Sequence, residues 1–171
     1  TMEQTMSNKE IILGIDLGTT TSEACIYKSK SKLKMIRNED GDDIIASVVG
    51  FDDVDKAIVI GEDARETQNP IEEIKRQMGS NVKLTLGDKK VTPEDVSAEI
   101  LKYIKNYSEE SLGEKISRAV ITVPANFDSN KREATLKAGK LAGFNVERII
   151  TEPTAAALAY CMEKEKESEF V

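Results

Sequence analysis

A carboxylate at the end of an apolar run is the first place in this 171-residue chain where chemistry is expected. The run 11–15 leads into Asp16, and a polar turn with Gly18, Thr19 and Thr20 follows directly. A carboxylate at the end of a buried strand can hold a hydrated divalent cation. A glycine lets the backbone approach a phosphate, and threonine amides and hydroxyls can donate to its oxygens. The turn therefore suits a metal-bound polyphosphate, although an ordinary hairpin with a polar tip explains it equally well.

Glu152 is a second candidate because it stands where an expected strand ends and a helix begins, with Pro153 at the first helical position. Open α/β sheets bind ligands at the carboxyl ends of their strands, and this carboxylate would project there. The alternative is a carboxylate that only complements the dipole of the following helix.

Three further candidates are a proline and two cationic residues. Pro124 begins a loop between an expected strand and an expected helix, and Arg132 lies on that helix. This arrangement again places polar groups at the carboxyl edge of the sheet; the alternative is a simple loop with a surface arginine. Lys75 stands in a charged helical segment, where a lysine side chain is ordinarily solvated.

The composition excludes several classes of protein and site. The chain has no histidine, which excludes histidine-built zinc sites and serine-hydrolase triads. It has no Gly-Lys-Ser/Thr and no GxGxxG, so it contains neither a Walker loop nor a dinucleotide fingerprint. The net charge of −7 argues against a dedicated nucleic-acid binder, which needs a clustered excess of Lys and Arg.

Other features of the sequence concern the setting of the protein. Cys25 and Cys161 lie far apart and form no metal-type spacing, which favours reduced thiols in a cytoplasmic protein. No apolar stretch approaches the roughly 20 residues that cross a bilayer, so no membrane contact is expected. Residues 1–10 are polar and are expected to be a leader outside the fold.

The spacing of apolar residues predicts an α/β fold, with antiparallel strands first and alternating strands and helices last. Strands are expected over about 11–16, 24–28, 33–37, 47–51, 57–60, 82–86, 119–123 and 146–150. Helical segments are expected from about 63, over 71–78, from 93, over 130–142 and over 153–162. Thr92 is expected to cap the start of the third of these segments, and Gly143 the end of the fourth. The final strand–helix–strand order implies a parallel crossover.

Taken together and in order, these motifs resemble the DnaK-type family of heat-shock chaperones. The resemblance covers about 11–160 and rests on the segments 14–20, 74–79, 119–125, 138–144 and 152–160. It implies the first lobe of an actin-like ATPase domain, which is an α/β, ribonuclease H-like fold with a mixed sheet covered by helices. We expect this lobe to span 11–171, with its core over about 11–60 and 118–165 and a small inserted subdomain over about 61–117.

The resemblance also implies that the first turn binds ATP or ADP with Mg²⁺. The family residue that matches Asp16 serves the metal through its water shell. Those that match Thr19 and Thr20 contact the phosphates, and Gly18 belongs to the same nucleotide-binding turn.

For the other candidates the resemblance implies roles in hydrolysis and signalling. The lysine that matches Lys75 orients the attacking water, and the glutamate that matches Glu152 sits near the same water and the metal. The residues that match Pro124 and Arg132 relay the nucleotide state to a peptide-binding domain. Phosphoryl transfer needs positioning and charge neutralisation more than a strong base, so the missing histidine is no obstacle.

For the whole protein, the resemblance implies an ATP-hydrolysing chaperone that assists protein folding. Its expected partners are unfolded or extended polypeptides, a J-domain co-chaperone and a nucleotide exchange factor. The family's second phosphate turn, Asp-Leu-Gly-Gly-Gly-Thr, has no counterpart in this sequence, so the fragment alone is expected to be inactive. An actin-like or sugar-kinase-like relative and a non-hydrolysing chaperone paralogue stay open as alternatives. The departures from the family pattern are Asn126 in place of a tyrosine, the stretch 44–47, and a shorter segment between 61 and 75.

Overall fold

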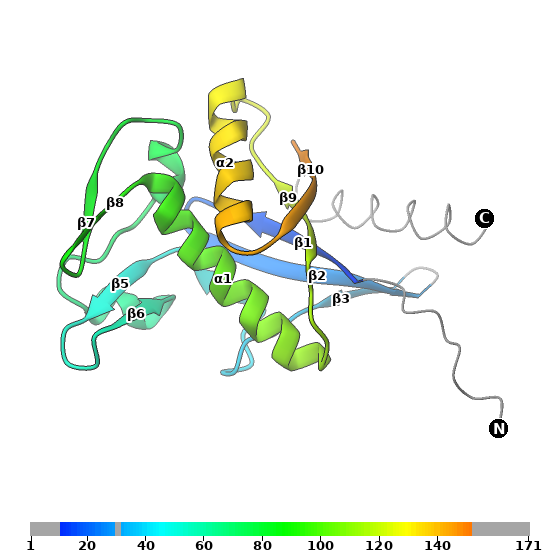
Figure 1. Ribbon diagram of the computed structural model, residues 1–171. Helices are drawn as coiled ribbons and strands as arrows, with labels where there is room; N and C mark the ends of the chain where they lie inside the picture. Colours follow the sequence, from blue (N-terminus) through cyan, green and yellow to red (C-terminus); the bar gives the residue numbers. More distant parts are fainter. Residues whose placement is uncertain (1–10, 30–31, 152–171) are drawn as a thin grey trace.

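The computed structural model describes residues 11–29 and 32–151 (Figure 1). The strands are β1 (Ile12–Leu17), β2 (Thr21–Ser29), β3 (Lys32–Met35), β4 (Ile44–Ala46), β5 (Val49–Asp52), β6 (Ala57–Ile60), β7 (Leu84–Leu86), β8 (Lys89–Val91), β9 (Arg118–Thr122) and β10 (Asn145–Ile150). The helices are α1 (Pro93–Leu112) and α2 (Ser129–Leu141), with two short 3₁₀ segments, η1 (Glu62–Glu66) and η2 (Ile74–Gln77).

The main sheet is mixed, as the sequence predicts. Its strands follow the order β10-β9-β1-β2-β3, and β4 pairs with β2 off this path. β1, β9 and β10 run parallel to one another, whereas β1, β2 and β3 form an antiparallel meander. The parallel strands β9 and β10 are joined through α2, which confirms the expected crossover. The carboxyl ends of the three parallel strands therefore meet at one edge of the sheet.

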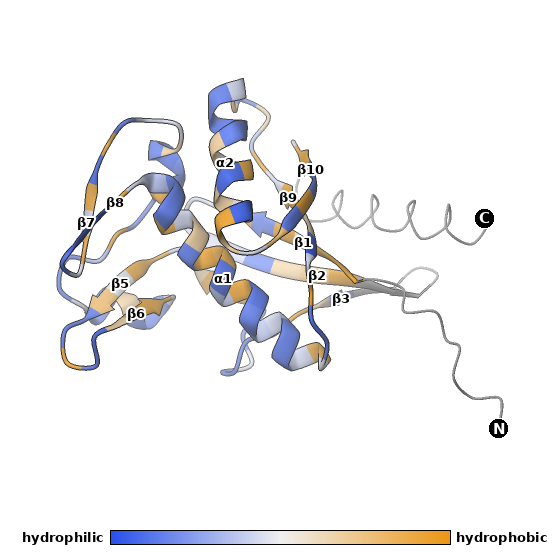
Figure 2. Cartoon of the chain, viewed as in Figure 1, coloured by the Kyte–Doolittle hydropathy of each residue, from blue (hydrophilic) through white to orange (hydrophobic). Residues whose placement is uncertain are grey.

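Helices α1 and α2 lie across the same face of the main sheet in Figure 1. In Figure 2 the strands carry mainly apolar residues, while α2 is largely hydrophilic. The buried side of α2 consists of small residues: Ala134, Thr135, Ala138 and Gly139. α2 lies very close to the sheet beneath it. A Cβ atom added at Gly139 would lie 2.5 Å from Val146 Cγ2 and 3.3 Å from Ile121 Cδ1, so only glycine permits this distance.

The start of α1 follows the predicted capping pattern. Thr92 Oγ1 accepts a hydrogen bond from the Asp95 amide at 3.1 Å, and the Asp95 carboxylate accepts one from the Thr92 amide at 2.9 Å. This capping box satisfies two backbone donors that a helix start otherwise leaves without partners. The hydrogen bond from the Thr92 backbone lowers the pKa of the Asp95 carboxyl below its ordinary value. The rest of the helix packs one face against the sheet. Val96, Ile100 and Ile104 on this face are fully buried.

The predicted helical segments near 63 and over 71–78 are wrong in type and length. Both are short 3₁₀ turns, η1 and η2. Thr67 ends η1 because its hydroxyl donates to the Ala64 carbonyl and its backbone is extended. Glu73 has a φ of 52°, which an α-helix does not accommodate, so the turn that carries Lys75 begins only at Ile74.

Several smaller predictions also need correction. The antiparallel strands of the first third are expected to form one meander, but β4 returns to β2 and β5 pairs with β6 in a hairpin of its own. The sequence reasoning missed β8, which pairs with β7 across a Gly87-Asp88 turn. α2 ends one residue early, with Ala142 as its cap, and Gly143 follows with a φ of 95°.

Two expectations about the organisation of the chain are not tested. The helix expected over 153–162 lies outside the described residues. The division into a core and an inserted subdomain over about 61–117 stays a prediction. Within the described part of the chain, no helix is long and apolar enough to span a bilayer.

Candidate functional site

Asp16 stands near the carboxyl end of β1, where two neighbouring strands fix its position. Parallel pairing aligns Asp16 with Thr122 of β9, and antiparallel pairing aligns it with Glu23 of β2. The Thr122 hydroxyl lies 3.0 Å from Asp16 Oδ1 and donates to it, with Ile15 O at 3.5 Å. Thr122 is buried while Asp16 is half-buried. The carboxylate is therefore oriented by a hydroxyl from the core and still reaches the edge of the sheet.

The turn that follows Asp16 joins β1 to β2 in an antiparallel hairpin, as predicted. A Cβ atom at Gly18 would lie 2.1 Å from the Thr21 carbonyl oxygen, so this turn can be made only with glycine. Thr19 is half-buried and Thr20 is exposed, which leaves the tip of the turn open to a ligand.

Lys75 reaches this turn from a distant part of the chain. Its side chain is only 8% exposed, and Nζ donates to the Leu17 carbonyl at 2.5 Å. Nζ also lies 5.5 Å from the centre of the Phe127 ring, a cation–π distance. Burial lowers the pKa of Lys75 below its ordinary value, and the nearby Asp16 carboxylate partly opposes this by favouring the charged form.

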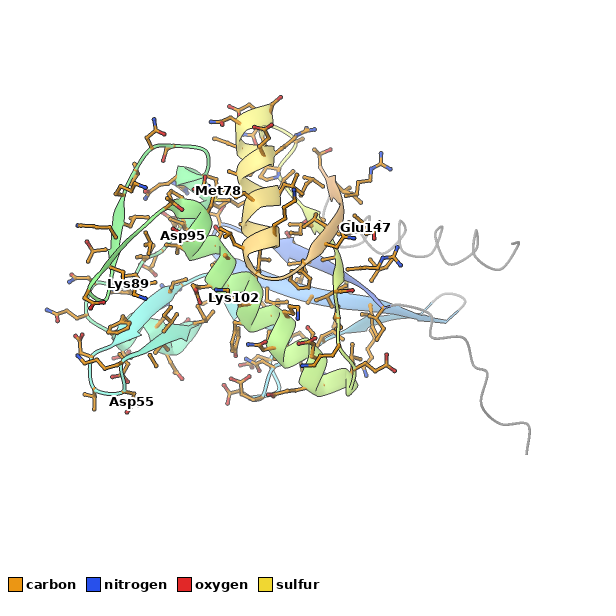
Figure 3. All side chains as sticks on the ribbon, in the orientation of Figure 1. Asp55, Met78, Lys89, Asp95, Lys102 and Glu147 are labelled. Atoms are coloured by element: carbon orange, nitrogen blue, oxygen red, sulfur yellow. The ribbon has the colours of Figure 1, made fainter. Side chains whose placement is uncertain are left out.

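The segment that carries Lys75 is anchored to the N-terminal part of α1. The Ser97 hydroxyl contacts the Met78 sulfur at 3.2 Å, and Glu94 accepts a hydrogen bond from the Gly79 amide at 3.3 Å. Figure 3 shows Met78 close to the start of α1, beside Asp95. Ile74, next to Lys75, is buried in the core. These contacts hold the short η2 turn in place without a long helix to support it.

The loop after β9 covers the ammonium group of Lys75. It folds back on itself, because the Phe127 amide donates to the Pro124 carbonyl at 3.1 Å. The Phe127 ring is also close to Lys131, whose ammonium group is 5.4 Å from the ring centre. Pro124 is half-buried, whereas Arg132 in the first turn of α2 is exposed. The structure thus brings the Pro124 loop to Lys75 and leaves the Arg132 side chain at the surface.

Glu152 lies outside the described residues. The strand that precedes it is described and ends at the same edge as Asp16. The pairing aligns Ile150 with Thr122 and Thr122 with Asp16, and the Val123 amide donates to the Ile150 carbonyl at 2.8 Å. Neighbouring strands are about 4.8 Å apart, so β10 lies about 10 Å from β1.

Sequence reasoning assigned no role to three residues that organise this edge: Thr122, Phe127 and Ser47. Ser47 donates to the Gly18 carbonyl and is nearly fully buried. Thr122 carried one available signal, since it is a polar residue near the end of an expected apolar strand. Phe127 and Ser47 carry no comparable signal, because their contacts join segments far apart in the chain.

Comparison with known families gives a consistent result over nearly the whole chain. The family model described as Hsp70 protein matches residues 12–86 and 80–171. The curated relatives include the chaperone protein DnaK of Ureaplasma urealyticum serovar 10, which is 49% identical over 160 residues. That match covers 91% of this chain and 26% of the relative. The chaperone protein DnaK of Mycoplasma mycoides subsp. mycoides SC is 45% identical over 167 residues, which cover 95% of this chain and 28% of the relative.

The chain thus spans about a quarter of the length of these relatives. The matched region includes every element of the described fold from β1 to β10, together with the Asp16 turn and Lys75. The chain therefore belongs to the Hsp70 protein family and is similar to its DnaK members.

Proposed function

We propose that this chain is the first lobe of the ATPase domain of a DnaK-type chaperone and that its turn 18–20 binds the phosphates of ATP or ADP. The observation that supports this most strongly is the position of Lys75. A lysine buried to this extent is rare unless its charge has a use, and its ammonium group lies against the turn, beside Asp16. A cation, a carboxylate and a glycine turn at one sheet edge form a set suited to phosphoryl transfer.

The residues at this edge fit magnesium better than a metal held entirely by protein ligands. No group of three or more Asp, Glu, Cys or His side chains gathers as a metal cluster among the residues that the structure describes. Mg²⁺ ordinarily keeps several waters and takes one or two carboxylates together with substrate phosphates. A single carboxylate oriented by Thr122 fits that mode, so we assign Asp16 to Mg²⁺ through its water shell.

Lys75 has the chemical role of orienting the attacking water and neutralising charge on the transferred phosphate. Its ammonium group is desolvated and is held by the Leu17 carbonyl and the Phe127 ring. A preorganised cation in a site with little water stabilises developing negative charge more strongly than one in solvent. Thr19 and Thr20 donate to the phosphates from the exposed tip of the turn.

The remaining roles complete the proposal. Glu152 acts beside the same water and metal, which the end of β10 at the Asp16 edge supports. Pro124 and Arg132 relay the nucleotide state to a peptide-binding domain, and the Pro124–Phe127 turn over Lys75 offers a direct start for that relay. The whole protein hydrolyses ATP in the cytoplasm and assists folding. Its clients are unfolded or extended polypeptides, and a J-domain co-chaperone and a nucleotide exchange factor regulate its cycle.

The test uses the full-length protein and two aspartate substitutions. Asp16→Asn removes the carboxylate charge at the site. Asp55→Asn is the matched control, because Asp55 lies at the far end of the β5–β6 hairpin (Figure 3). We expect Asp16→Asn to lower Mg²⁺-dependent, peptide-stimulated ATP turnover by about a hundredfold or more, and the control to leave it unchanged. Equal turnover in Asp16→Asn and the wild type would refute the proposal.

A further inference from the structure

Two buried serines brace the turn that carries Gly18, Thr19 and Thr20. Ser47 and Ser22 are 2% and 1% exposed, and their hydroxyl oxygens lie 2.8 Å apart. Ser47 Oγ also lies 3.0 Å from the Gly18 carbonyl oxygen, and the Ser47 amide donates to the Thr20 carbonyl at 2.8 Å. One residue therefore holds both ends of the turn from the core side.

The two contacts that link Ser22, Ser47 and Gly18 form a hydrogen-bond relay, and counting protons fixes its direction. A serine hydroxyl has one proton to donate, and a carbonyl oxygen can only accept. Ser47 must therefore use its proton on the Gly18 carbonyl. The contact between the two hydroxyls then requires the Ser22 proton, so Ser22 donates to Ser47 and Ser47 donates to Gly18. The relay gives each buried hydroxyl a partner, as buried polar groups require.

The bond to the Gly18 carbonyl also sets the direction of the next amide. The carbonyl of Gly18 and the N–H of Thr19 belong to one planar trans peptide unit, in which the two bonds point in opposite directions. Because the Gly18 carbonyl points toward Ser47 in the core, the Thr19 N–H points away from it. An amide aimed out of the core at this turn is a ready donor for an anionic oxygen.

We propose that Ser47 is a positioning residue for phosphate binding, and that it acts by orienting the Thr19 amide through the Gly18 carbonyl. Ser22 supports this role by holding the Ser47 hydroxyl in its donating orientation. The inference rests on the proposed function, since it names the residue that prepares the same phosphate turn. Because a Cβ at position 18 would clash with the Thr21 carbonyl, Gly18 has no side chain to restrict its backbone, and the hydrogen bond from Ser47 supplies such a restriction.

The test compares MgATP with adenosine, measured as dissociation constants by calorimetry on the full-length protein. Adenosine lacks phosphates, so a change that affects only phosphate binding at the turn should leave its affinity unchanged. We expect Ser47→Ala to weaken MgATP binding by about tenfold and to leave adenosine binding unchanged. Ser22→Ala keeps the Ser47–Gly18 bond and should weaken MgATP binding by only about twofold. The double variant should match Ser47→Ala, because Ser22 acts on the turn only through Ser47.

Each other outcome overturns a defined part of the account. MgATP affinity of Ser47→Ala equal to that of the wild type overturns the positioning role. An equal loss for MgATP and adenosine also overturns it, because general loss of folded protein would weaken both ligands alike. Fully additive losses in the double variant overturn the relay from Ser22. If the wild-type protein binds MgATP no more tightly than adenosine, the proposed function fails and this inference fails with it.

Discussion

Thr122 Oγ1 donates to Asp16 Oδ1 at 3.0 Å, across the parallel pairing of β9 with β1. The two residues are 106 positions apart in the chain, yet the register places them side by side at the edge of the main sheet. The bond fixes the orientation of a carboxylate that would otherwise rotate about its side-chain torsions. Thr122 is buried, so the bond is shielded from competition with water.

Removal of this hydroxyl should weaken the use of magnesium rather than the fold. Thr122→Val keeps the shape of the side chain and loses the donor to Asp16. We expect the Mg²⁺ concentration for half-maximal ATP turnover of the full-length protein to rise by about tenfold, the size typical for partners of metal-binding groups. Thr122→Ser keeps the hydroxyl and should resemble the wild type. An unchanged Mg²⁺ requirement in Thr122→Val would show that the bond does not orient the carboxylate for the metal.

The close packing of α2 predicts a steric effect that a second substitution relieves. Gly139→Ala places a methyl group 2.5 Å from Val146 Cγ2, a stiff β-branched side chain. We expect the free energy of unfolding to fall by about 1–3 kcal/mol, measured by urea denaturation of this chain. Val146→Ala removes the clashing atom, so the double variant should be less destabilised than the sum of the two single changes. Additive effects would mean that this contact is not the source of the clash.

The capping box at the start of α1 should stabilise the chain measurably. Thr92→Ala removes the acceptor for the Asp95 amide, and we expect it to cost about 1 kcal/mol in the free energy of unfolding. Ser111→Ala is the control on the same helix, because Ser111 is exposed in its last turn and should change stability by less than about 0.5 kcal/mol. Equal effects of the two substitutions in urea denaturation would show that the cap contributes nothing.

The lowered pKa of Lys75 predicts a rise in stability at alkaline pH. At pH values below the folded-state pKa, Lys75 is charged in both states and adds no pH dependence. Between that pKa and the ordinary value of 10.5, the unfolded chain binds more protons than the folded one, so the contribution of Lys75 to stability increases with pH.

Urea denaturation of the wild type and Lys75→Met, from pH 7 to pH 10.5, measures this contribution. As pH rises and Lys75 loses its charge, the free energy of unfolding of the wild type should increase relative to that of Lys75→Met. Lys140→Met is the control, since Lys140 is exposed on α2. A pH-independent difference between the wild type and Lys75→Met would mean that Lys75 titrates alike in both states.

Much of the local structure of the candidate site could be predicted from sequence because its signals are local. Asp16 at the end of an apolar run, the glycine turn after it and the Thr92 cap each depend on neighbours within a few positions, and the structure has all three. The alternation of strands and helices in the last third likewise predicted the parallel crossover through α2. Local rules suffice for such features because hydrogen bonds and backbone torsions within one segment decide them.

The remaining features depend on contacts between distant segments, which a single sequence does not contain. From the sequence alone, Lys75 is expected to be solvated. The fold instead buries it and gives its ammonium group a hydrogen bond to the Leu17 carbonyl, 58 positions away. Its segment looked helical, but the left-handed backbone at Glu73 shortens it to one 3₁₀ turn. Ser47 stands at the start of an expected strand and looks ordinary in the sequence, until the fold brings it against Gly18. Register and packing decide these contacts, and spacing along the chain cannot supply them.

The most direct test of the central claim compares two lysines that share one aromatic ring. Lys75 and Lys131 both place their ammonium groups about 5.4–5.5 Å from the Phe127 ring centre, but Lys75 also donates to the Leu17 carbonyl, next to the turn 18–20. Single-turnover ATP hydrolysis by the full-length protein should fall by about a hundredfold or more in Lys75→Ala. In Lys131→Ala it should stay within about twofold of the wild type, because Lys131 lies outside the proposed site. Hydrolysis by Lys75→Ala at the wild-type rate would contradict the claim that this sheet edge carries the chemistry.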